Sequence, residues 1–195
     1  MMKTSAKYPS TLNIGDITMS GKNNLRFIKL LLPVMIAMIA IIIGATPSDA
    51  ATNYTLTNRS SAKCMDLKNW ITSNGQPIIQ WSCNAGNNQR WQISKVSIFS
   101  SYYKIVNVHS GKCLDVKDGN TSAGTKIQQW SCSSSNINQQ WALQDVDPGA
   151  TVRYVIKPRG NTSVCLGVAD ISNGTQVQLQ ACTSAYSQQW LRQIP

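Results

Sequence analysis

One pattern occurs three times after the first fifty residues: two cysteines separated by 19, 19 and 17 positions, followed shortly by Gln-x-Trp. The tryptophans Trp91, Trp141 and Trp190 lie 50 and 49 residues apart. This regular period predicts three copies of one structural unit, each packed against its neighbours. The copies span about residues 51–100, 101–148 and 149–195, and their cysteines are Cys64 and Cys83, Cys113 and Cys132, and Cys165 and Cys182.

Short segments within each copy alternate apolar and polar residues, as at Tyr103 and Ile105 or at Leu114 and Val116. A period of two predicts half-buried β-strands, and no window shows a sustained helical period. Glycine-containing dipeptides mark one turn at the same place in each copy. Four short strands per copy, about twelve in total, predict an all-β closed or nearly closed fold. The glycine-containing dipeptides of the predicted turn are Asn74-Gly75, Ala123-Gly124 and Asn173-Gly174.

The first fifty residues lie outside the repeats. Lys22, Arg26 and Lys29 precede an apolar run of 16 residues, 30–45, and small residues flank Asp49. A basic flank, an apolar stretch and a small-x-small end are typical of a secretory signal. We therefore expect residues 1–50 to be a leader and signal peptide, and 51–195 to be secreted without a membrane contact. The alternative is an uncleaved anchor, but the run is shorter than the roughly 18–20 residues of a spanning helix.

Basic residues outnumber acidic ones after residue 50, with 13 Lys and Arg against 6 Asp and no Glu, a formal charge of +7. They occur singly throughout all three copies. A nucleic-acid site needs a clustered basic patch, so we expect no nucleic-acid partner.

All six cysteines follow the predicted signal, and an even number at repeated spacings in an exported chain indicates disulfides. The repeat favours pairing within each copy (64–83, 113–132 and 165–182) over the other pairings. Metal binding is the alternative, but the chain has no Cys-x-x-Cys and a single histidine, His109. We therefore expect neither a metal site nor another cofactor.

Residues 113–116 (Cys-Leu-Asp-Val), 128–132 (Gln-Gln-Trp-Ser-Cys) and the Gln-x-Trp motifs resemble the ricin B-chain lectin family, also known as the family 13 carbohydrate-binding modules. The resemblance covers roughly residues 51–195. It implies a β-trefoil, which has three lobes of four strands and one sugar pocket for each lobe. Function still depends on the residues of each pocket, because one fold supports several functions.

The resemblance also assigns roles to residues. An acid two positions after the first cysteine and nearby amides would bind sugar hydroxyls, and an aromatic two positions before the second cysteine would cover the apolar face of the ring. The second copy has the full set, whereas Ile79 replaces one polar residue in the first. The predicted carbohydrate-binding residues are Asp115, Gln128, Trp130, Asn138 and Gln139, and Asp66, Trp81, Asn88 and Gln89.

The third copy has Gly167 for the acid, Gln180 for the aromatic and Ser187 for the asparagine, so we predict a structural lobe. The acids of the first two copies could instead cap turns, and their tryptophans Trp81 and Trp130 could instead lie in the core. Because the third copy lacks both the acid and the aromatic, we favour a binding site that the two residues share. The three Gln-x-Trp tryptophans occur in every copy and are expected in the core. Trp70 has no counterpart, and we expect it to pack in its loop rather than widen the first pocket.

An intrinsic enzyme is not expected. A glycosidase needs two carboxylates about 5–9.5 Å apart, whereas Asp66 and Asp115 occupy equivalent places in separate copies. No Gly-x-Ser-x-Gly motif occurs, and His109 is expected in a solvated turn. The sequence therefore predicts a secreted lectin for galactose-type or xylan-like glycans. The alternatives are a protein-binding trefoil such as a protease inhibitor, or a targeting subunit bound non-covalently to a separate enzyme or toxin.

Overall fold

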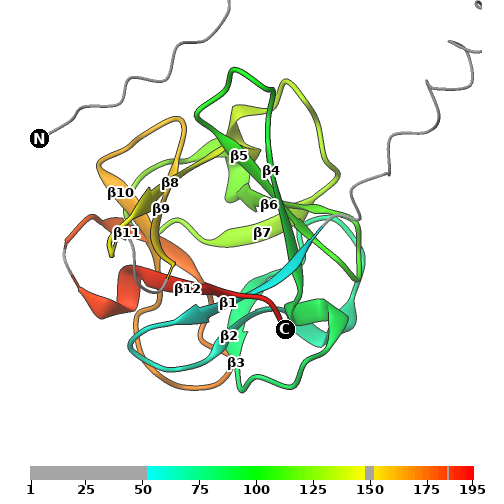
Figure 1. Cartoon of the computed structure of the whole chain (residues 1–195), viewed down its shortest axis with the longest axis vertical. Helices are drawn as coiled ribbons and strands as arrows, with labels where there is room; N and C mark the ends of the chain where they lie inside the picture. The colour runs from blue at the N-terminus through cyan, green and yellow to red at the C-terminus, as the bar shows by residue number, and fades with distance from the viewer. Residues whose placement is uncertain (1–51, 148–151, 184) are drawn as a thin grey trace, which may run out of the picture. The chain divides into compact units, whose positions relative to one another are not determined.

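Each repeat folds into four short β-strands, as the sequence predicts (Figure 1). The computed structural model describes residues 52–147, 152–183 and 185–195, and the predicted leader lies outside them. Helical structure in the described ranges is limited to single 3-10 turns, and none of these helices is long and apolar enough to cross a membrane. The strands are β1 (Asn53–Asn58), β2 (Cys64–Leu67), β3 (Ile78–Trp81), β4 (Trp91–Lys95), β5 (Tyr103–Asn107), β6 (Cys113–Val116), β7 (Ile127–Trp130), β8 (Trp141–Asp145), β9 (Arg153–Pro158), β10 (Val164–Gly167), β11 (Gln178–Ala181) and β12 (Gln189–Gln193).

The first and fourth strands of the repeats form a closed antiparallel barrel. Its neighbours pair in the order β1, β4, β5, β8, β9 and β12, and β12 returns to β1. The second and third strands of each repeat form the hairpins β2–β3, β6–β7 and β10–β11, which Figure 1 shows at separate places around the barrel. Three such units related by a pseudo-threefold axis make a β-trefoil, so the predicted fold class is confirmed.

The three Gln-x-Trp tryptophans are fully buried in one apolar core, as predicted. Each indole Nε1 donates a hydrogen bond of 3.0–3.1 Å to a backbone carbonyl on the second strand of its own repeat. A buried indole needs such an acceptor, and these bonds tie the hairpin of each repeat to the barrel. The donor and acceptor pairs are Trp91 and Met65, Trp141 and Leu114, and Trp190 and Leu166.

One disulfide joins the two cysteines of each repeat, which confirms the predicted pairing. The three bridges use all six cysteines. Their Cα–Cα distances of 5.1, 5.1 and 5.0 Å suit an unforced bridge. Each bridge links the second strand to the chain just after the third strand. The hairpin that carries the candidate acid is therefore closed at its base.

The predicted glycine turns connect the repeats in a cycle. Gly75, Gly124 and Gly174 adopt φ of 81°, 91° and 87°, a region that other residues rarely populate. Their backbone N–H groups donate to the third strand of the neighbouring repeat at 2.7–2.9 Å. The first repeat thereby contacts the second, the second the third, and the third the first. The acceptors are the carbonyls of Gln129, Leu179 and Gln80, respectively.

Candidate functional site

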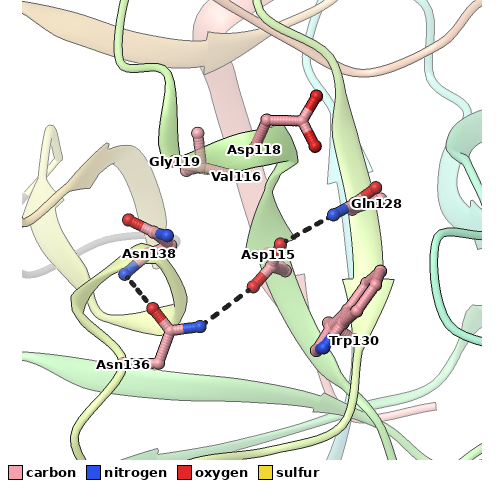
Figure 2. Close-up of a pocket in the computed structure, with 8 residues that line it drawn as sticks. All are labelled: Asp115, Val116, Asp118, Gly119, Gln128, Trp130, Asn136 and Asn138. Atoms are coloured by element: carbon pink, nitrogen blue, oxygen red, sulfur yellow. Dashed lines mark hydrogen bonds between the residues drawn. The ribbon is translucent and has the colours of Figure 1, made fainter.

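In the second repeat, Asp115 lies on β6 directly opposite Gln128 on β7. Gln128 Nε2 donates to Asp115 Oδ1 at 3.0 Å, and Gln139 Nε2 donates to Oδ2 at 3.1 Å. Asn136 Nδ2 adds a longer contact of 3.5 Å to Oδ2, and Figure 2 shows the acid between the two amides of Gln128 and Asn136. Three side-chain amides therefore fix the orientation of one carboxylate.

Burial raises the pKa of Asp115, because only 4% of the residue is exposed. The amide hydrogen bonds lower that pKa, and the nearby charge of Asp118 raises it. A carboxylate has about four acceptor positions, of which the protein fills three. The remaining position is available to a hydroxyl donor in the cavity.

The acid opens onto a shallow cavity of about 180 Å³. Trp130, 43% exposed, forms one wall beside Asp115 (Figure 2). Gly75 from the first repeat lies near this indole, since a Cβ there would be 3.8 Å from Cζ3 of Trp130. A flat indole next to a fixed carboxylate offers an apolar face and a polar group to one ligand. The lining residues are Asp115, Val116, Asp118, Gly119, Gln128, Trp130, Asn136 and Asn138.

The first repeat holds its acid differently. Asn88 Nδ2 and Gln89 Nε2 both donate to Asp66 Oδ2, at 2.9 and 2.7 Å. Ile79 stands opposite Asp66 on β3, so within the described residues Oδ1 receives no side-chain hydrogen bond. Burial raises the pKa of Asp66, and the two amide bonds lower it. One oxygen of this acid is therefore left for a ligand.

The first cavity has a volume of about 200 Å³ and two indole walls. Trp81 is 43% exposed and lies near Gly174 of the third repeat, where a Cβ would be 3.7 Å from its Cζ3. Trp70, 46% exposed, lines the same cavity, so the prediction of simple loop packing is wrong. His109 lies in a turn, as predicted, but it is half-buried and forms a T-shaped ring contact with Trp70.

The third repeat fills the position of its acid. A Cβ at Gly167 would lie 2.4 Å from Gln180 Oε1, so the Gln180 amide occupies the space that an aspartate side chain takes in the other repeats. Gln188 Nε2 donates to this oxygen at 3.3 Å. An amide thus replaces both the acid and the exposed platform, which fits the predicted structural lobe.

The predicted residues fall into two groups. The first group lines the cavities and consists of Asp66, Asp115, Trp81, Trp130, Gln128, Asn88 and Asn138. The second group consists of Gln89 and Gln139, which are fully buried and donate hydrogen bonds to the acids. The sequence did not indicate Asn136, because its counterparts in the other repeats are Gly86 and Ala185, which have no polar side chain. No group of three potential metal-ligating side chains exists among the described residues. Other lining residues that the sequence did not indicate are Asp118, Gly119, Lys68, Asn69, Asn84 and Gly174.

Several known proteins are similar to this chain, although no curated protein matches it. The designed threefold-symmetric protein ThreeFoil is 37% identical over 72% of this chain and 96% of its own, with a TM-score of 0.65. An exo-β-1,3-galactanase from Clostridium thermocellum is 29% identical over 77% of this chain but only 31% of its own, with a TM-score of 0.67. The Macrolepiota procera ricin B-like lectin, solved with lactose, shares the fold at 20% identity over 77% of this chain and all of its own, with a TM-score of 0.61.

A family model also matches the sequence, over residues 42–130 and 87–180. Its description is ricin-type β-trefoil lectin domain-like. Together the two matches span more than half of the chain and include both cavities. The closed barrel, the three hairpins and the Gln-x-Trp core agree with this assignment. The chain therefore belongs to the ricin-type β-trefoil lectin domain-like family.

Proposed function

We propose that the chain is a lectin that binds glycans through the cavities of its first and second repeats. One observation carries the proposal: a buried acid, fixed by amides, lies beside a half-exposed tryptophan in both repeats. The third repeat has lost the acid and the tryptophan together. The acid and the tryptophan are either both present or both absent, as expected for two parts of one binding site. A scaffold role would require them in all three repeats.

The cavities suit a short glycan segment of one or two sugar units. Their volumes of about 180 and 200 Å³ are well below the roughly 300–1,000 Å³ of pockets that enclose drug-sized ligands. Such small contacts bind weakly, so two sites on one rigid body would gain affinity on multivalent glycans. In the first repeat, Asn88 Oδ1 is a buried acceptor without a donor among the described residues, and a sugar hydroxyl would supply one.

Galactose-type sugars are the first ligands to test, and xylan-like glycans the second. The similarity to part of an exo-β-1,3-galactanase supports the galactose class. The three disulfides support export to an oxidising compartment, in line with the predicted signal.

A targeting role for a separate enzyme is the second candidate. The same galactanase supports it, because the similar region is about a third of that enzyme. All six cysteines of this chain are paired, so an enzyme partner would associate non-covalently. Co-purification from the native source would test this role.

A glycan array probed with the oxidised protein tests the lectin proposal. Wild type should bind galactose-type or xylan-like glycans, and Asp66→Ala and Asp115→Ala should each weaken the signal. Asp145→Ala is the matched control, since Asp145 is an exposed acid on β8 that lines neither cavity. Full binding by the double variant Asp66→Ala/Asp115→Ala would reject both cavities as the glycan sites.

A further inference from the structure

The two cavities differ at a reciprocal pair of positions. Trp70 follows Asp66 by four residues, where the second repeat has Gly119 after Asp115. Gly86 precedes the 3-10 turn 87–89, where the second repeat has Asn136. A Cβ at Gly86 would lie 2.8 Å from Trp70 Cζ2. The missing side chain at Gly86 therefore makes room for the indole of Trp70.

The second repeat excludes a large side chain at the same place. A Cβ at Gly119 would lie 2.9 Å from Asn138 Nδ2. In the first repeat the equivalent asparagine, Asn88, instead turns to Asp66 and bonds it at 2.9 Å. Trp70, Gly86 and the orientation of Asn88 thus form one arrangement, which differs from that of the second repeat.

The backbone at Trp70 is unfavourable for a tryptophan. Its φ is +59°, and the preceding Asn69 has φ of +57°, so two successive residues adopt the left-handed conformation. The second repeat places Gly119 at this point, with φ of +66°. His109 Nε2 lies 2.9 Å from the Trp70 carbonyl oxygen, and the ring centroids are 4.9 Å apart. Backbone strain of this kind occurs preferentially at functional sites.

Trp70 borders the first cavity without filling it. The cavity remains about 200 Å³ in volume, compared with about 180 Å³ in the second repeat. The acid, its amide donors and the Trp81 wall match the set that we propose to bind one sugar ring in the second repeat. The additional indole is therefore available for a second ring.

We infer that the first site binds two linked sugar rings, one beside Asp66 and Trp81 and the next against Trp70, whereas the second site binds a single ring. This inference rests on the proposed lectin function and assigns Trp70 as the residue that selects for ligand length. The two sites then differ in specificity: the first prefers internal or terminal disaccharide units, and the second binds chain ends.

Single-site variants allow the two cavities to be compared by calorimetry. Asp115→Ala leaves the first site and Asp66→Ala leaves the second. Each is titrated with D-galactose and β-1,3-galactobiose, and with D-xylose and xylobiose. The preference of a site is the ratio of its affinity for the disaccharide to its affinity for the monosaccharide. We expect this ratio to be about 2- to 10-fold larger at the first site than at the second. Adding Trp70→Gly to the first-site protein should reduce its preference to that of the second site, whereas Trp70→Phe should retain most of it.

Phe99→Gly is the matched control, because Phe99 is an aromatic residue, 93% exposed, that lines neither cavity. It should leave the preference for disaccharide unchanged. Equal loss of both ligands in Trp70→Gly, or no loss of either, would overturn the two-ring assignment while the lectin proposal stands. Failure of every protein, wild type included, to bind any of the four sugars would overturn the inference and remove the support for these sugar classes.

Discussion

The pocket of the third repeat should be restored by two substitutions, Gly167→Asp and Gln180→Trp. Gly167 lies in β10 opposite Gln178, the counterpart of Gln128, so a new aspartate would meet an amide donor in register. Gln188 is available as a second donor once Gln180 leaves. A tryptophan at 180 also has space, because a Cβ at Gly124 would contact nothing within 4 Å. In the other two repeats the equivalent glycines lie beside Trp130 and Trp81.

The two substitutions should be strongly coupled in their effect on stability. Gly167→Asp alone displaces the Gln180 amide. We expect it to lower the free energy of unfolding by about 1 kcal/mol through crowding and by about 1 kcal/mol through the lost hydrogen bond to Gln188. Gln180→Trp alone loses only that bond, about 1 kcal/mol. The destabilisations of the two single variants add up to about 3 kcal/mol. The double variant has no crowding and loses the hydrogen bond only once, so we expect it to be destabilised by about 1 kcal/mol. The predicted coupling free energy is therefore about 2 kcal/mol.

Denaturant unfolding of the wild type, both single variants and the double variant measures this coupling. Calorimetric titration with the best glycan from the array then counts sites, and we expect an increase from two to three in the double variant alone. Additive destabilisation, together with an unchanged number of sites, would refute the proposal that the Gln180 amide occupies the place of the acid in the third repeat.

Three further predictions concern the scaffold and the acids. Replacing Cys113 and Cys132 by alanine should lower the free energy of unfolding by about 3 kcal/mol, because the bridge joins residues 19 positions apart and closes the loop between them; an unchanged denaturation midpoint would contradict this. Trp141→Phe should cost about 2–4 kcal/mol, since it removes a buried hydrogen bond and core volume, and thermal unfolding measures the loss. Burial raises the pKa of Asp66 and Asp115 in the folded state, so the folded protein binds these protons more tightly than the unfolded chain. As the pH falls through the raised pKa, glycan affinity should decrease while the contribution of these groups to stability increases. Titrations and unfolding of wild type over this range should show these opposite trends, and the Asp66→Asn/Asp115→Asn variant should lack both contributions. Parallel trends in wild type would contradict the assignment.

The repeat made most of the fold predictable from sequence. Three copies of one pattern fixed the disulfide pairs, the glycine turns and the buried tryptophans such as Trp141, because each depends on local spacing. Comparison of the copies also identified Asp66 and Asp115 as candidate site residues. These features follow from residue type and position within a single unit.

The differences between the sites were not predictable, since they depend on contacts between loops. Trp70 enters the first cavity only because Gly86, 16 residues later, has no side chain. Asn136 contacts Asp115 from a position at which the first repeat has Gly86, which has no side chain. The filling of the third pocket likewise depends on how the flexible side chain of Gln180 folds back over Gly167. Spacing alone does not show such side-chain orientations.

The number of glycan sites per chain is the most direct test of the account. Calorimetric titration of the oxidised protein should give two sites for wild type and for Asp145→Ala, one for Asp66→Ala or Asp115→Ala, and none for the double variant, with each variant shown to be folded by thermal unfolding. Two sites remaining in a folded double variant would contradict the assignment of both cavities.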